Sequence, residues 1–122
     1  MKNLLFLITF LSITLISNAQ SLSFDEELDV IGYMEGKSFY NSETGLEIEY
    51  GYISSYNTIG IKVKNKYGEK FYYINVEISA YGRYADLYGM SPETGANFGF
   101  RLFNGKLVVG YGQDGAQTFY EK

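Results

Sequence analysis

Apolar and polar residues alternate with a period of two along much of the chain. In Leu46–Tyr52 the even positions are Leu, Ile or Tyr, and the odd positions are Glu or Gly. Ile59–Lys64 shows the same pattern, with Ile and Val alternating against Gly and Lys. This period is typical of antiparallel strands that have one buried and one solvated face. The pattern therefore predicts an all-β domain.

Two turn sequences predict how neighbouring strands pair. A two-residue turn at Tyr67-Gly68 sets apolar residues of its flanking strands opposite one another. Asn104-Gly105, a strong type I′ signal, does the same for the strands around it. The first turn pairs Val63 with Tyr72, Ile61 with Ile74 and Ile59 with Val76, and the second pairs Leu102 with Leu107, Phe100 with Val109 and Phe98 with Tyr111.

Charge complementarity predicts one further strand pair. Placing Glu49 opposite Lys62 and Glu47 opposite Lys64 brings unlike charges together and keeps both apolar faces inward. These carboxylates are therefore interpreted as ladder partners on a solvated face and not as catalytic acids.

The last hairpin has two solutions. A two-residue turn at Asp114-Gly115 directs Thr118 and Tyr120 inward and leaves Phe119 outside. A three-residue loop with a bulge reverses these directions. The alternation alone does not choose between them.

A short helix precedes the strands. Ser23 as N-cap and Glu26 three residues later match a capping box. A helix from about Phe24 to Met34 would place Phe24, Leu28 and Ile31 on one face, and Gly36 would end it. An irregular arm is the alternative. We thus expect a small antiparallel meander barrel of seven or eight strands after this helix, with a β-sandwich as the alternative.

The N-terminus indicates export. Met1–Ala19 has Lys2, then a mostly apolar run, then Ser17-Asn18-Ala19, which is typical of a secretory signal peptide cleaved after Ala19. An uncleaved anchor is the alternative, although the apolar run is short for one. We therefore expect a signal peptide over 1–19, an arm or short helix over 20–36, and one β domain over 37–122. It would work in the periplasm or outside the cell, with no membrane anchor after cleavage.

Composition narrows the function. The chain has no His, Cys or Trp, so it has no His-based nucleophile pair, no imidazole metal ligand and no disulfide. Its formal net charge of −4 offers no basic surface for nucleic acid. The best carboxylate pair for a glycosidase-like site, Glu77 with Asp86, has no support from its spacing. We therefore expect a protein that is not an enzyme and that has no cofactor and no metal.

The stretch Ala80–Asn97 is the first candidate site, because it does not form a clean hairpin pattern. A recognition loop would use its aromatic and charged side chains, since Tyr combines a rigid ring with a hydroxyl. The alternative is a further strand whose tyrosines cap the barrel, with Arg83 and Asp86 paired on the surface. The candidate ligand-binding residues are Tyr81, Arg83, Tyr84, Asp86 and Tyr88.

The barrel interior is the second candidate site. Inward parity is predicted for Tyr50, Tyr52, Tyr72, Tyr111 and Tyr120. These rings either fill the lumen or line a cavity for a small ligand. Five glycines on the outward parity favour strong strand curvature, with a shallow binding surface as the alternative. They are Gly51, Gly60, Gly99, Gly110 and Gly112.

Two functions fit these features. The first is a non-catalytic exported domain that binds a saccharide or a small amphipathic ligand through the Tyr-rich stretch or the barrel mouth. The second is a protein-interaction module, such as an inhibitor or an envelope assembly factor, that acts through an exposed strand edge or through the outer face of glycines and aromatic residues.

The export assignment predicts the mass of the mature protein. Mass spectrometry of the exported fraction is expected to find a chain that begins at Gln20, as glutamine or as pyroglutamate. Retention of Met1–Ala19 in that fraction would contradict the assignment.

Overall fold

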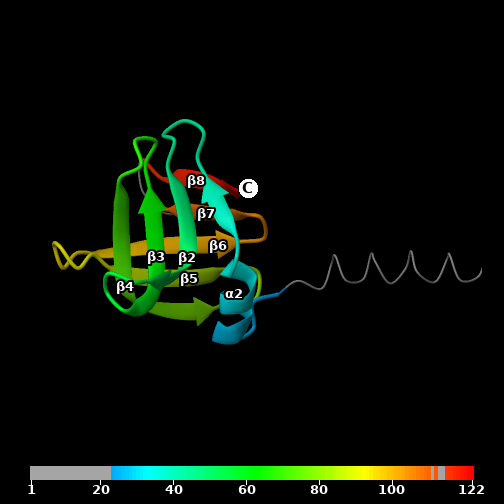
Figure 1. Ribbon diagram of the computed structural model, residues 1–122. Helices are drawn as coiled ribbons and strands as arrows, with labels where there is room; N and C mark the ends of the chain where they lie inside the picture. The colour runs from blue at the N-terminus through cyan, green and yellow to red at the C-terminus, as the bar shows by residue number, and fades with distance from the viewer. Residues whose placement is uncertain (1–22, 111, 113–114) are drawn as a thin grey trace, which may run out of the picture.

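Eight antiparallel strands close into a barrel in the computed structural model, which describes residues 23–110, 112 and 115–122. Each strand pairs with the next in the chain, and β1 pairs with β8 (Figure 1). This topology confirms the predicted meander barrel over the sandwich. The elements are α2 (Glu27–Met34), β1 (Ser38–Tyr40), β2 (Glu47–Ile53), β3 (Thr58–Lys64), β4 (Lys70–Ala80), β5 (Ala85–Met90), β6 (Asn97–Phe103), β7 (Lys106–Val109) and β8 (Gln117–Glu121).

Inward side chains from the strands form one hydrophobic cluster. Phe39 of β1, Leu87 of β5 and Leu107 of β7 are fully buried in it, together with Phe119 of β8. Burying one such side chain contributes about 1.5–3 kcal/mol to the free energy of folding. Because the chain has no cysteine, this core stabilises the fold without disulfides.

The helix begins later than the sequence predicts. Its N-cap is Glu26, whose backbone N–H donates to the Asp29 carboxylate at 2.9 Å. The prediction of Ser23 as N-cap was wrong, because the Ser23 hydroxyl donates to Asp25 and Asp29 takes the position that completes the capping box. The predicted apolar face was also wrong in part, since Leu28 is 73% exposed.

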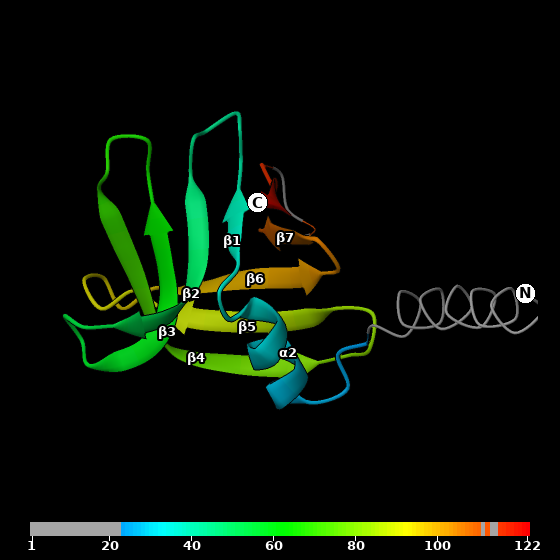
Figure 2. The same cartoon turned by 45° about the vertical axis from the view of Figure 1, so that its right-hand side comes forward.

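Helix α2 instead buries Val30 and Met34, which are four residues apart on one face. Phe24 is buried as well, but it precedes the helix and exchanges two backbone hydrogen bonds with Gly82 in the β4–β5 turn. The helix therefore lies against the end of the barrel where the β4–β5 and β6–β7 turns meet (Figure 2). This end is called the helix end below.

Tyr33 ties α2 to two parts of the helix end. Its hydroxyl donates to the Glu121 carboxylate and accepts from the Gly105 backbone N–H, each at 2.7 Å. Burial, followed by the hydrogen bond to Glu121, raises the pKa of Tyr33 to about 12. The phenol thus stays protonated, as its donor role requires, through the neutral pH range.

The predicted two-residue turn at Tyr67-Gly68 was wrong by one residue. The loop contains three residues, because the Asn65 side chain accepts from the backbone N–H groups of Tyr67 and Glu69. Gly68 adopts φ +85°, a conformation that favours glycine. Val63 consequently pairs with Phe71, Lys62 with Tyr72, and Ile61 with Tyr73.

A β-bulge at Asn75 compensates for this shift. The register of β4 with β5 changes between Ile74 and Glu77, and Asn75 has φ +52°. Tyr73 therefore packs on the core before the bulge, and Val76 packs on it after the bulge. The predicted inward parity was wrong for Tyr72, which lies beside Lys62, and was confirmed for Val76.

Other predicted pairings are confirmed. The Asn104-Gly105 hairpin has the expected register of Leu102 with Leu107 and of Phe100 with Val109, whereas Tyr111 lies outside the described residues. Glu49 pairs with Lys62 and Glu47 pairs with Lys64.

The ends of three strands show where simple alternation fails. Phe119 is buried opposite Leu107, which is the direction that the three-residue loop predicted, but β7 ends at Val109 and β8 begins at Gln117, so the connection is longer than either predicted turn; Asp114 lies outside the described residues. Tyr120 is exposed, as are Tyr52 and Ile59 at the ends of β2 and β3, against their predicted inward parity.

Two glycines that are direct partners on β2 and β3 have different surroundings. Gly51 and Gly60 are direct partners, but a Cβ at Gly60 would overlap the Tyr73 carbonyl oxygen and approach Ile53 Cδ1 within 2.8 Å. A Cβ at Gly51 would meet only the end of the Lys62 side chain, at 3.8 Å.

Gly60→Ala is therefore expected to lower the free energy of unfolding by about 1–3 kcal/mol through overpacking. Its matched control, Gly51→Ala, is expected to change that free energy by less than about 0.5 kcal/mol. Urea denaturation of both variants measures the difference. Equal effects at the two positions would contradict the described contact at Gly60.

Candidate functional site

The structure divides the Tyr-rich stretch into a turn and a strand. Tyr81, Arg83 and Tyr84 lie in the β4–β5 turn, and Asp86 and Tyr88 lie in β5. Tyr81 and Tyr88 are exposed, and Tyr84 is partly buried. The stretch is therefore not one loop, although its tyrosines still offer ring surface to solvent.

Asp86 forms the strongest charged interaction of this face. Its carboxylate accepts from Arg101 Nε at 2.7 Å and from Arg101 Nη2 at 2.9 Å, a bidentate arrangement that fixes both groups. The predicted partner Arg83 was wrong, because strand β6 pairs with β5 and places Arg101 directly opposite Asp86. Asp86 is only 8% exposed, so this ion pair is largely shielded from water.

Tyrosine rings extend the ion pair toward the helix end. The Arg101 guanidinium lies 4.2 Å from the centroid of the Tyr84 ring, within the range of a cation–π interaction. The Tyr81 ring lies 5.1 Å from that of Tyr84, with an angle of 31° between the ring planes. Tyr81, Tyr84, Arg101 and Asp86 thus form a continuous row.

Tyr88 continues the same face toward the opposite end of the barrel. It pairs with Gly99 of β6, and a Cβ on Gly99 would lie 3.2 Å from the Tyr88 ring. The ring therefore lies close over a position that has no side chain. Tyr88 remains 50% exposed, which leaves much of its surface available to a ligand.

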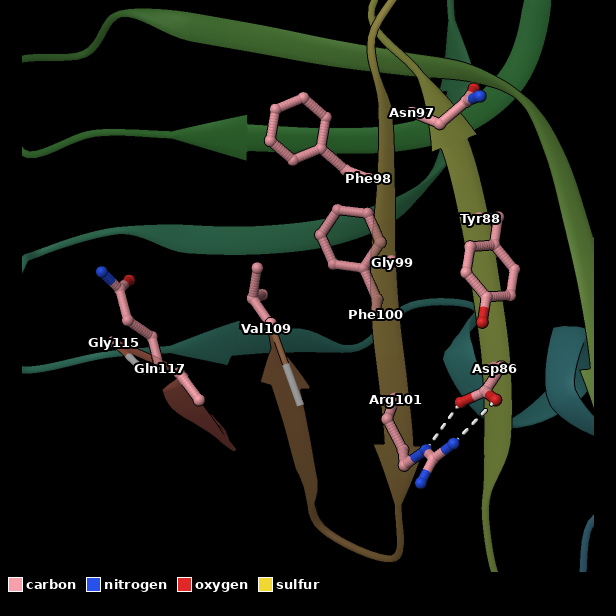
Figure 3. A pocket seen from close by; sticks show the side chains of 12 residues that line it. Asp86, Tyr88, Asn97, Phe98, Gly99, Phe100, Arg101, Val109, Gly115 and Gln117 are labelled. Carbon is pink, nitrogen blue, oxygen red and sulfur yellow. Dashed lines mark hydrogen bonds and ion pairs between the residues drawn. The ribbon is translucent and has the colours of Figure 1, made fainter. Parts of the chain in front are cut away.

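A groove of about 550 Å³ runs across β6 at this point. In Figure 3, Phe98, Phe100 and Gln117 lie on one side of β6, and Asp86 and Tyr88 lie on the other. Gly99 lies between the two sides, and the Tyr88 ring covers the position that a Gly99 side chain would take. The groove thus joins the Tyr-rich stretch to residues at the mouth of the barrel.

Tyr73 supports the apolar wall of the groove from inside the barrel. Its ring lies 4.9 Å from the Phe98 ring and 5.6 Å from the Phe100 ring, both in edge-on geometry. Burial raises the pKa of Tyr73. The Phe98 ring itself is partly exposed on the groove side, so one face contacts protein and another contacts solvent.

Two amide groups supply polar contacts. Asn97 and Gln117 both line the groove, and within residues 23–110, 112 and 115–122 neither side-chain amide has a hydrogen-bond partner. Each such amide offers two N–H donors and a carbonyl acceptor. Asn97, at the end of the predicted stretch, was not named as a site residue, and Phe98, Arg101 and Gln117 lie outside that stretch, because the proximity of these residues depends on the strand register.

Among the described residues that line the groove, no nucleophilic side chain lies beside a general base. Of the two acids considered for a glycosidase-like site, Asp86 is bound to Arg101. The other, Glu77, lies on β4 opposite Tyr88. The described part of the chain contains no cluster of three side chains able to hold a metal ion.

No family model matches this chain, and no curated protein or solved structure matches it either. Within the described ranges, no helix has the length and apolar character needed to cross a membrane.

The ion pair under the groove is expected to contribute to stability. Asp86→Ala removes a shielded bidentate partner of Arg101 and is expected to lower the free energy of unfolding by about 1.5–3 kcal/mol. The matched control is Glu49→Ala, because Glu49 forms an exposed pair with Lys62 at 4.0 Å. This control is expected to cost about 0.2–1 kcal/mol. Thermal and urea unfolding would contradict the assignment if the two losses were equal.

Proposed function

We propose that this protein is a non-catalytic exported binding module that takes a neutral saccharide in the groove across β6. The observation that carries the proposal is the convergence of exposed aromatic rings with unpartnered amides in one hollow. Sugar rings have apolar C–H faces and hydroxyl edges, so they are suited to stacking on Tyr88 or Phe98 and to hydrogen bonding with Asn97 and Gln117.

A saccharide fits the groove better than an amphipathic ligand does. The volume of about 550 Å³ lies within the range of small-molecule sites. The groove is partly open to solvent and has polar groups on both sides of β6 (Figure 3). An aliphatic chain would leave those amides without partners, which is unfavourable wherever the ligand excludes water.

The charge of the site favours a neutral ligand. The Arg101 guanidinium is already bound to Asp86 through two hydrogen bonds, so the pair carries no net charge toward the groove. The chain as a whole has a formal net charge of −4, which repels acidic polymers.

The protein-interaction alternative has less support from the fold than the saccharide proposal has. One of its two expected surfaces is an exposed strand edge, and each of the eight strands in the described barrel has two neighbours. A closed barrel removes the edge that strand addition needs. The export expected from Met1–Ala19 remains part of the proposal and is tested by the mass measurement given above.

Titration calorimetry with neutral oligosaccharides of hexose and N-acetylhexosamine units tests the proposal. At least one of them is expected to bind, and Tyr88→Ala and Gln117→Ala are each expected to weaken binding about tenfold. The matched control is Tyr67→Ala, an exposed tyrosine in the β3–β4 turn outside the groove, which is expected to bind like the parent.

Two outcomes would overturn the saccharide assignment. One is that no oligosaccharide of the panel binds to the parent protein. The other is that Tyr88→Ala and Gln117→Ala, shown to be folded by circular dichroism, bind as tightly as the parent.

A further inference from the structure

A second hollow continues the groove around the barrel. It has a volume of about 320 Å³ and lies between the β1–β2 turn and the start of β8. Ala116 and Gln117 line both hollows. At this boundary Ala116 has a small, exposed side chain, and Gln117 beside it is partly buried. The two hollows are therefore adjoining sections of one surface path.

The second hollow repeats the chemistry of the first. Tyr120 provides a ring that is 63% exposed, and Thr118 provides a hydroxyl beside it. Ser42 and Glu43 on the β1–β2 turn form the opposite wall. Among the described residues, the Glu43 carboxylate has no hydrogen-bond partner. An aromatic face opposite polar groups is the same combination that Tyr88 and Gln117 present.

The wall of the second hollow is held rigidly. Asn41 is buried, and its side-chain N–H donates to the Thr118 carbonyl oxygen at 2.9 Å. Its side-chain oxygen accepts from the backbone N–H groups of Glu43 and Thr44 at 2.9 and 3.0 Å. The Gly45 N–H closes the turn on the Asn41 carbonyl oxygen at 2.8 Å. A wall fixed in this way loses little conformational entropy when a ligand binds.

Resting on the proposed function, we infer that the ligand is an extended saccharide chain that occupies both hollows, and that Gln117 contacts it at their junction. A single sugar would use one aromatic platform and leave the other unused. A chain brings successive rings onto Tyr88 and Tyr120, and the second contact then forms within an existing complex. Linked binding of this kind raises affinity without any further contact at the first site.

A length series tests this inference. The probes are neutral β-1,4-linked and α-1,4-linked glucose oligomers and β-1,4-linked N-acetylglucosamine oligomers of one to six units, each titrated against the full mature protein. The binding constant is expected to rise with length and then level off once both hollows are occupied. Tyr120→Ala is expected to lose this gain, about tenfold for one aromatic contact, for the longest oligomer.

Controls separate this inference from the proposed function. Tyr67→Ala is expected to keep the full length dependence, because its ring lines neither hollow. If monosaccharides bind as tightly as hexamers and Tyr120→Ala has no effect, the extended-chain inference fails while the proposed function stands. If no probe of any length binds, the proposed function fails and the inference fails with it.

Discussion

The fold depends on a constraint in β4, where the inward face of the strand changes partway along it. A three-residue loop after Asn65 sets Tyr73 inward, and the bulge at Asn75 then sets Val76 inward. Without the extra residue, one half of β4 would direct its apolar side chains to water, since a one-residue shift reverses every face. The bulge thus lets one strand contribute to the core along its whole length, and it fixes Tyr73 behind Phe98 and Phe100. The position of Tyr73 behind the apolar wall of the groove is therefore a consequence of the register of β4.

At the helix end, the turns are held in place by contacts with α2. There α2 spans two turns, through the backbone pair of Phe24 with Gly82 and through the hydroxyl of Tyr33 on Gly105. These contacts satisfy polar backbone groups that a barrel end leaves without strand partners. The groove extends to the opposite end, where the recorded pairing of β6 with β7 stops at Val109 and Gly110 turns with φ +73°. A helix therefore packs against one end of the barrel, and the groove lies toward the other end.

The alternation of residue types was sufficient to predict the barrel and the Asn104-Gly105 hairpin, because each depends on local turn chemistry and on which faces are apolar. It failed where a side chain changed the loop length, as Asn65 does, or where one non-glycine residue adopted positive φ, as Asn75 does. Of the candidate site, Asp86 and Tyr88 were found by residue type alone. Arg101 and Gln117 were missed, since they come from strands whose register relative to β5 no single-strand pattern reveals. A site predicted from one contiguous segment therefore includes the residues of that segment and omits those that neighbouring strands contribute.

The packing of the barrel explains why the proposed binding site lies on its outer surface and at its mouth. Eight strands enclose an interior that side chains can just fill, and here Phe39, Leu87 and Phe119 are fully buried in it. Such a core stabilises a chain that has no disulfide, but it uses the space that a larger barrel would give to a ligand. Aromatic residues beyond those needed for the core must then lie elsewhere, and Tyr88 and Tyr120 have exposed rings on the outside, Tyr88 over Gly99 and Tyr120 opposite Lys106. Stability from core packing and the outer position of the proposed ligand site thus follow from the same barrel size.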